Sequence, residues 1–141
     1  MYLDSTYIAK FYLNEPDSRQ VRAVLAGAST LVSSTWAMGE VACAFHRHLR
    51  EGVLDTAQYR KLLGAFLDHV AAGVWTLIPV TDQLMRKTVA LMGAIQPTVY
   101  LRAGDAMHLT AAMDSGEREI WTSDRHLLAA AGYFGLTGRS A

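Results

Sequence analysis

The chain has 141 residues, a length typical of one domain, and we expect residues 1–141 to form a single domain. Its 13 lysine and arginine residues balance 13 aspartate and glutamate residues, which excludes a disordered, highly charged chain and a basic protein that coats nucleic acid. No apolar run approaches the roughly 18 residues that span a membrane, and no signal peptide is visible. The single cysteine, Cys43, excludes an internal disulfide and suits a reducing cytoplasm. We therefore expect a cytoplasmic protein that is not bound to a membrane.

Short apolar runs alternate with helix-forming segments along the whole chain. The expected strands cover residues 2–4, 30–34, 75–80, 119–123 and 134–137. The expected helices cover residues 5–15, 17–27, 36–51, 55–73, 81–91, 103–115 and 125–131. Ser5 and Thr6 are expected to cap the first helix, Thr35 the third, and Asp55 with Gln58 the fourth. This alternation indicates an α/β fold in which helices cover both faces of a short, mostly parallel sheet.

Four acidic residues stand near the ends of expected strands or in early turns of helices. Asp4 ends the first strand, and Asp124 follows the fourth. Glu40 lies in the second turn of the third helix, and Asp105 lies in the first turn of the sixth. Because sites in open α/β sheets form at the carboxyl ends of the strands, we expect all four to face one edge. The alternatives are that Asp4 and Asp124 only cap helices and that Glu40 is a solvated helix residue.

Carboxylates that converge in this way need a cation among them. Two carboxylates about 4 Å apart repel each other by about 4 kcal/mol at an effective dielectric constant near 20. The five histidines are scattered and there is one cysteine, which disfavours a zinc site. Oxygen ligands suit hard cations, so the expected metal is Mg²⁺, with Mn²⁺ as a substitute.

The acids lie in short motifs that follow one another in a fixed order. These motifs are Leu3-Asp4-Ser5 ahead of Asn14-Glu15-Pro16, then Met38-Gly39-Glu40-Val41, then Leu101-Arg102-Ala103-Gly104-Asp105-Ala106-Met107-His108-Leu109, and finally Trp121-Thr122-Ser123-Asp124-Arg125. The third resembles the D-A-x-H-L signature, and the fourth the T-x-D element, of PIN domains. In order and spacing the whole set resembles the PIN domain family, especially the VapC-type toxins of type II toxin–antitoxin pairs. The resemblance implies a PIN-like α/β/α sandwich over residues 1–141.

The resemblance also implies an activity, that of a Mg²⁺-dependent endoribonuclease. Such an enzyme hydrolyses RNA phosphodiester bonds with a metal-activated water and leaves a 5′-phosphate and a 3′-hydroxyl. The residues that it implies as catalytic groups and metal ligands are Asp4, Glu40, Asp105 and Asp124. Thr122 would support Asp124, and Ser5 would bond to a ligand carboxylate or to a metal-bound water. The implied partners are RNA, a cognate antitoxin protein and a second copy of the chain in a homodimer.

Several neighbours of the acids have two interpretations. Arg102 and Arg125 are candidates for contacts with RNA phosphates, and solvated helix arginines are the alternative. His108 lies on the helical face of Asp105, and we interpret it as a buried histidine that stabilises the helix, with a contact to the phosphate as the alternative. Gly104 replaces a residue that is often larger in the family, which is expected to loosen that turn. Without the four candidate ligands the chain has an excess of four positive charges, which is compatible with RNA as a substrate.

Other functions fit the sequence less well. A haloacid-dehalogenase-type phosphatase needs a second aspartate two residues after Asp4, where this chain has Thr6. A receiver domain needs a lysine late in the chain, and none follows Lys87. A non-catalytic PIN-like module that binds RNA or protein is the remaining alternative. Apolar stripes on the helices over residues 36–51 and 55–73 would suit a homodimer or a groove for an antitoxin helix.

Overall fold

Five short parallel strands form the centre of the computed structural model, which describes all residues from Met1 to Ala141. The strands are β1 (Tyr2–Leu3), β2 (Val32–Ser34), β3 (Thr76–Ile78), β4 (Glu119–Trp121) and β5 (Thr137–Arg139). Their order across the sheet is β3-β2-β1-β4-β5, and every neighbouring pair is parallel. The expected α/β fold with a short sheet is confirmed, and the sheet contains no antiparallel pair.

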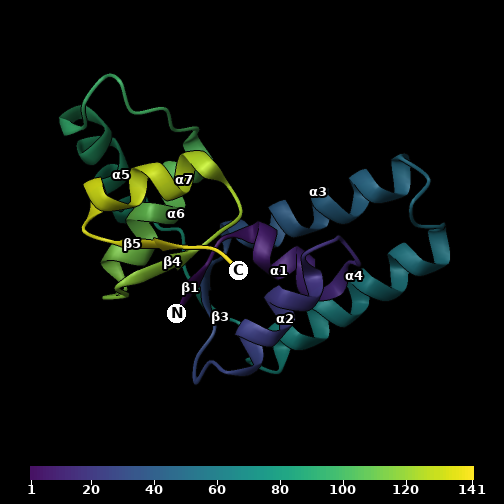
Figure 1. Cartoon of the computed structure of the whole chain (residues 1–141). Coiled ribbons are helices and arrows are strands. Elements are labelled where there is room, and N and C mark those ends of the chain that lie inside the picture. Colours follow the sequence, from purple (N-terminus) through teal and green to yellow (C-terminus); the bar gives the residue numbers. More distant parts are fainter.

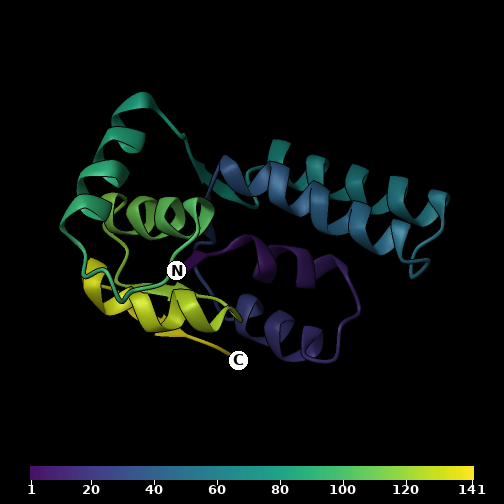
Figure 2. The same ribbon diagram turned by 90° about the horizontal axis from the view of Figure 1, so that it is seen from above.

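Seven α-helices flank the sheet. They are α1 (Ser5–Tyr12), α2 (Ser18–Ala26), α3 (Trp36–Arg50), α4 (Thr56–Ala71), α5 (Asp82–Ala94), α6 (Ala103–Asp114) and α7 (Arg125–Ala130). Figures 1 and 2 show α5, α6 and α7 gathered on one side of the sheet and α1 to α4 on the other. Helices α3 and α4 form an antiparallel hairpin that extends away from the sheet. None of the helices combines the length and the apolar character needed to cross a lipid bilayer.

Two hydrophobic cores lie on opposite faces of the sheet. Successive side chains of a strand point to opposite faces, so Tyr2 and Leu3 of β1 belong to different cores. The core around Tyr2 is filled mainly by α6 and α7, and the core around Leu3 by α1 and α3. Burial of these apolar faces holds the helices on both sides of strands that are too short to be stable by themselves.

The first and third helices begin differently from the prediction. Asp4, not Ser5 or Thr6, is the N-cap of α1, and its carboxylate accepts a hydrogen bond from the backbone N–H of Tyr7. Thr35 makes no side-chain cap bond to α3. Its hydroxyl oxygen instead accepts the backbone N–H of Val80, which ties α3 to the segment after β3.

The predicted last strand over residues 134–137 is wrong in its bounds. Residues Ala131–Phe134 form a 3₁₀-helix that continues α7. Gly135 ends this helix with a φ of 70°, a backbone conformation that favours glycine. The strand therefore begins later, at Thr137, whose N–H donates to the carbonyl oxygen of Arg118.

Candidate functional site

A polar cavity of about 290 Å³ lies at the carboxyl ends of β1 and β4. Its lining residues are Asp4, Ser5, Thr6, Glu40, Arg102, Gly104, Asp105, His108, Asp124 and Leu127. Only one of these residues, Leu127, is hydrophobic. The tertiary structure thus brings all four predicted acids to one cavity, from the ends of two strands and from α3 and α6.

Asp4 is the most deeply buried of the four acids, with 2% of its surface exposed. Its Oδ1 accepts hydrogen bonds from the Thr6 hydroxyl at 2.6 Å and the Tyr7 N–H at 3.1 Å, and its Oδ2 accepts the Thr122 hydroxyl at 2.5 Å. Burial raises the pKa of Asp4 above its ordinary value, and these hydrogen bonds only partly oppose the increase. The carboxylate is held in place by hydrogen bonds, and its charge is poorly solvated because the side chain is buried.

Thr122 connects two of the acids. The side chain is fully buried and does not line the cavity. Its hydroxyl donates to Asp4 and accepts the backbone N–H of Asp124 at 2.9 Å. Asp124 in turn caps α7, because its Oδ1 accepts the N–H of His126 at 2.7 Å. Thr122 is therefore a positioning residue for both Asp4 and Asp124.

Glu40 is paired with a histidine from α6. His108 Nε2 lies 2.7 Å from Glu40 Oε2, and because a carboxylate only accepts, this nitrogen is the donor. The other ring nitrogen, Nδ1, lies 2.9 Å from the hydroxyl of the buried Tyr2. Burial alone would raise the pKa of Glu40, but the hydrogen bond and charge of His108 outweigh it and lower the pKa below the ordinary value. Glu40 is therefore held as a carboxylate.

Asp105 and Asp124 share one arginine. Arg102 Nε donates to Asp105 Oδ2 at 3.0 Å, and its terminal NH₂ group donates to Asp124 Oδ2 at 2.8 Å and to Asp105 Oδ1 at 3.3 Å. The backbone N–H of Arg102 also donates to Asp105 Oδ2, so this carboxylate caps the first turn of α6. The carboxylates raise the pKa of Arg102 further. A single guanidinium thus bridges two of the four acids.

Gly104 allows Glu40 to approach α6 closely. A Cβ atom at position 104 would lie 2.9 Å from Glu40 Oε1 and 3.2 Å from Trp36 Nε1, both closer than side chains normally pack. The sequence suggested only that glycine loosens this turn. The structure shows a different reason for the residue, which is the space that the Glu40 carboxylate occupies.

The remaining predicted site residues differ in position. Ser5 and Arg102 line the cavity. Arg125 is exposed at the start of α7 and does not line it. Three features of the site were not identified from the sequence. They are the bond of the Thr6 hydroxyl to Asp4, the bond of His108 to Glu40, and the contact of the Tyr2 hydroxyl with His108. The contact of Thr6 was the one that the sequence could have predicted, because a hydroxyl two residues after an N-cap aspartate is well placed to bond to it.

The donor set of the cavity suits a hard divalent cation. It consists of four carboxylates and the hydroxyls of Ser5 and Thr6. The cavity has no cysteine and a single histidine, His108, which is bonded to Glu40. In the present arrangement no three acidic or histidine side chains come together as a group that could hold a metal ion. In this arrangement Asp105 and Asp124 pair with Arg102, and Glu40 pairs with His108. The residues fit the cation chemically, but Arg102 occupies carboxylate oxygens that a cation would use.

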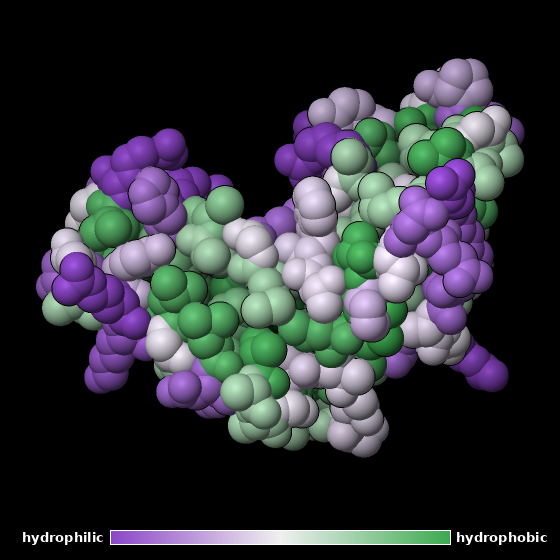
Figure 3. Space-filling view, turned by 180° about the vertical axis from the view of Figure 1, so that it is seen from behind, coloured by the Kyte–Doolittle hydropathy of each residue, from purple (hydrophilic) through white to green (hydrophobic).

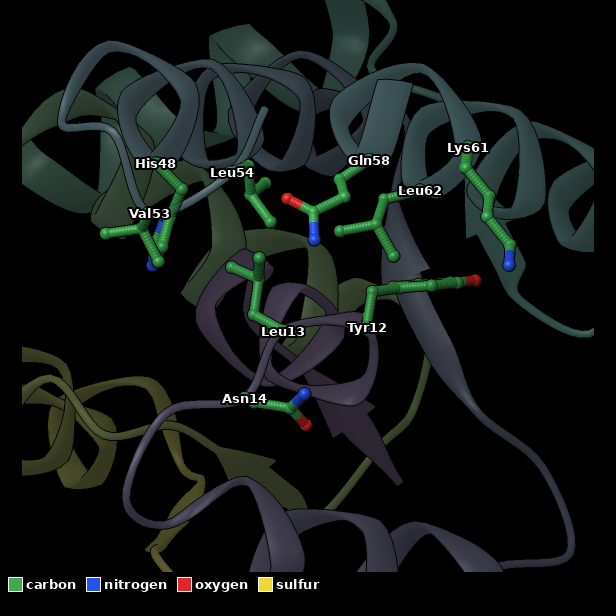
Figure 4. A pocket seen from close by; sticks show the side chains of 9 residues that line it. All are labelled: Tyr12, Leu13, Asn14, His48, Val53, Leu54, Gln58, Lys61 and Leu62. Carbon is green, nitrogen blue, oxygen red and sulfur yellow. The ribbon is translucent and has the colours of Figure 1, made fainter. Parts of the chain in front are cut away.

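A second cavity, of about 350 Å³, lies between α1 and the α3–α4 hairpin (Figure 4). Leu54 and Leu62 reach toward Leu13 across it, and Gln58 points into the same space. No acidic side chain lines this cavity. Of these two cavities, only the smaller one is lined by acidic side chains.

Most of the chain matches a known domain family. The family model of the PIN domain matches residues 1–133. The chain belongs to the PIN domain family. A comparison with curated proteins gives no match. Among solved structures, the PIN domain is similar to a chain in the crystal structure of VapBC2 from Rickettsia felis bound to a DNA fragment from their promoter, with a TM-score of 0.69 and 12% sequence identity over 99% of this chain and 97% of that chain. At this identity the likeness concerns the fold.

Proposed function

We propose that this PIN domain is an endoribonuclease that depends on Mg²⁺, with Mn²⁺ as a substitute. One observation carries the proposal: Asp4, Glu40, Asp105 and Asp124, which are far apart in the sequence, line a single cavity at the carboxyl edge of the sheet. Membership of a family whose domains are generally nucleases supports it. The atoms of the four acids that can bind a metal are all oxygens. Such a set suits a divalent cation that binds a phosphodiester substrate.

Each residue in and around the cavity has a separate role in the proposed reaction. Asp4 and Asp105 would hold the cation, with Asp124 as a further ligand. The cation would supply Lewis-acid chemistry, namely a lower pKa of a water molecule and compensation of charge on the phosphate. Glu40, kept ionised by His108, orients the attacking water. Asp124 completes the acidic set, and Thr122 positions it together with Asp4. Arg102 and Arg125 contact RNA phosphates, and no side-chain nucleophile is needed.

The decisive experiment compares cleavage of RNA by the wild-type chain and by Asp105→Asn. We expect cleavage with Mg²⁺ or Mn²⁺ that leaves 5′-phosphate ends and that EDTA abolishes. Loss of a metal ligand is expected to reduce the rate by at least about 100-fold, since even indirect support of a ligand is worth that much. Asp82→Asn is the matched control, because Asp82 is exposed and pairs only with Arg86 on α5.

Full activity of Asp105→Asn would contradict the proposed site. Absence of any cleavage by the wild-type chain, with RNA binding retained, would favour a non-catalytic PIN-like binding module.

We further propose that the nuclease is a VapC-type toxin that acts in the cytoplasm and that a cognate antitoxin protein neutralises. The likeness of the fold to a chain of a VapBC2 structure supports this role. Expression of the chain alone is expected to arrest growth, and co-expression of a small protein encoded next to it is expected to restore growth. Growth that is unaffected by the wild-type chain at levels where Asp105→Asn accumulates would contradict the toxin role.

A homodimer is part of the same proposal. Several large hydrophobic side chains are exposed: Trp36, Val53, Leu67, Val74, Met85, Val89, Tyr100 and Tyr133. Figure 3 shows that hydrophobic surface gathers in the middle of the face opposite to that of Figure 1, with hydrophilic residues toward both ends. Light scattering coupled to size-exclusion chromatography is expected to give twice the mass of the chain, and a monomer at all concentrations would contradict the dimer.

A further inference from the structure

The position of Arg102 has a consequence for how the acidic cavity binds a cation. The guanidinium contacts both oxygens of Asp105 and one oxygen of Asp124. The proposed function assigns Asp105 to the cation and Asp124 to the same acidic set. A divalent cation on these carboxylates would lie close to the guanidinium, and two positive charges at such short distance repel each other. The arginine and the cation therefore compete for the same carboxylates.

We infer that Arg102 is a built-in competitor of the divalent cation, and that its guanidinium moves away from Asp105 and Asp124 when these residues bind metal. This inference rests on the proposed function, because it assumes that the two carboxylates are metal ligands. It adds a property of this chain's own side chain, namely that the affinity of the site for metal is limited by an internal ion pair.

The surroundings of Arg102 allow it to leave. Its side chain is 60% exposed, whereas those of Asp105 and Asp124 are 10% and 21% exposed. Exposed ion pairs are weak and exchange readily with water, so the guanidinium can swing toward solvent. A phosphate group of a bound RNA is an alternative partner, since a guanidinium binds phosphate with two parallel hydrogen bonds.

The two carboxylates stay in place when the guanidinium leaves. Asp105 still accepts the backbone N–H of Arg102, a bond that does not involve the arginine side chain. Asp124 still accepts the N–H of His126 at the start of α7. Removal of the guanidinium therefore frees oxygens that are already oriented, and metal affinity should rise.

The test is a titration of the 141-residue chain with Mn²⁺ alone, measured by isothermal titration calorimetry at constant ionic strength. The Arg102→Gln variant is expected to bind Mn²⁺ about fivefold more tightly than the wild type, the factor that corresponds to one weak ion pair. Arg86→Gln is the matched control, because it removes the same charge from an exposed Arg–Asp pair outside the cavity. Its affinity for Mn²⁺ should equal that of the wild type. Circular dichroism establishes that each variant is folded.

The outcomes separate this inference from the proposed function. Equal or weaker Mn²⁺ binding by Arg102→Gln, with binding by the wild type that Asp105→Asn abolishes, would overturn the competition and leave the metal site intact. An equal gain in Arg102→Gln and Arg86→Gln would also overturn it, because the effect would then be one of net charge. Failure of both the wild type and Arg102→Gln to bind Mn²⁺ would overturn the proposed metal site and the inference with it.

Discussion

The acids of the cavity do not all have the same partners, and the partners determine how well the charge of each carboxylate is stabilised. Asp4 is buried and bonded to hydroxyl and backbone groups, Glu40 faces a histidine, and Asp105 and Asp124 share Arg102. A neutral hydroxyl stabilises a carboxylate less than a guanidinium does. Asp4 therefore has the poorest compensation for the loss of solvent, as the raised pKa of its side chain indicates.

Replacement of Asp4 by asparagine is expected to stabilise the fold at neutral pH. Because the pKa of Asp4 is raised in the folded state, the folded chain binds more protons than the unfolded chain above the ordinary value of 3.8. The free energy of unfolding of the wild type therefore falls as pH rises from 3.8 toward the raised pKa of Asp4. Asp4→Asn has no carboxylate at this position, so its stability does not fall for this reason. Thermal denaturation in EDTA should show a melting temperature difference that favours Asp4→Asn and grows from pH 4 to pH 8. A difference that is independent of pH would contradict this prediction.

The space at Gly104 predicts different effects on stability and on function. Gly104→Ala is expected to change stability by no more than about 1 kcal/mol, because the better helix propensity of alanine is offset by the displacement of Glu40 from the buried His108 and by the close contact with Trp36 Nε1. The new Cβ would displace the end of the flexible Glu40 side chain, which it would meet at 2.9 Å. RNA cleavage should fall by about tenfold or more, as for other losses of support around a site. Chemical denaturation and cleavage assays test the two parts, and unchanged cleavage would contradict the second.

At the scale of elements, the site depends on where parallel strands end. β1 and β4 are neighbours, so the residues that follow them, Asp4 and Thr122, meet directly. Helices α3 and α6 then bring Glu40 and Asp105 to the same edge. A buried lysine helps to fix this edge, since Lys10 of α1 donates to Asp17 before α2 and to Ser123 after β4.

The pair of Lys10 and Asp17 predicts a pH-dependent contribution to stability. The hydrogen bond from Lys10 lowers the pKa of Asp17 below its ordinary value of 3.8. A lowered carboxylate pKa stabilises the folded state above that value, and the contribution is lost as pH falls through the lowered pKa. Asp17→Asn should cost about 0.5 kcal/mol at pH 7, a modest figure because Asp17 is more than one third exposed.

The measurement is urea denaturation of Asp17→Asn and the wild type at pH 7 and near pH 2.5. The difference should shrink at the lower pH. Asp82→Asn, which breaks the fully exposed pair with Arg86, is the control and should cost less at pH 7. A loss that is the same at both pH values would show that the charge of Asp17 is not the cause.

At the scale of the whole molecule, burial is uneven. Helix α6 lies against the sheet and has eight buried residues in succession, from Asp105 to Ala112. Helix α4 has a single buried residue, Phe66, and forms the outer part of the hairpin that extends from the sheet (Figure 1). The acidic cavity is thus built on the most deeply packed helix, while the hairpin offers exposed surface to a partner.

Hydrogen exchange should reflect this difference. Backbone amides of α6 are expected to exchange only through global unfolding, and those of α4 through local opening, which occurs at lower free energy. Exchange followed by mass spectrometry should be at least about tenfold slower in α6 than in α4. Equal protection of the two helices in the isolated chain would contradict this prediction. A second copy or an antitoxin bound to the hairpin should slow exchange in α4.

The alternation of apolar runs and amphipathic segments was sufficient to predict the α/β fold, because the period of an apolar pattern follows from local geometry. The same reading misplaced the last strand, since a 3₁₀-helix that ends at Gly135 differs from a strand by backbone dihedrals that short apolar runs do not specify. It also placed the cap of α1 one or two residues late, at Ser5 and Thr6 instead of Asp4.

The sequence alone determined which acids could meet, because parallel strands end at one edge and the positions of Asp4 and Asp124 follow from the strand pattern. The tertiary structure decided what each acid contacts. The sequence matched Thr122 to Asp124 but did not match three other pairs, which are Glu40 with His108, Thr122 with Asp4, and Arg102 with Asp124. Such contacts depend on side-chain rotamers and on the distance between packed elements, which no local pattern of residues encodes.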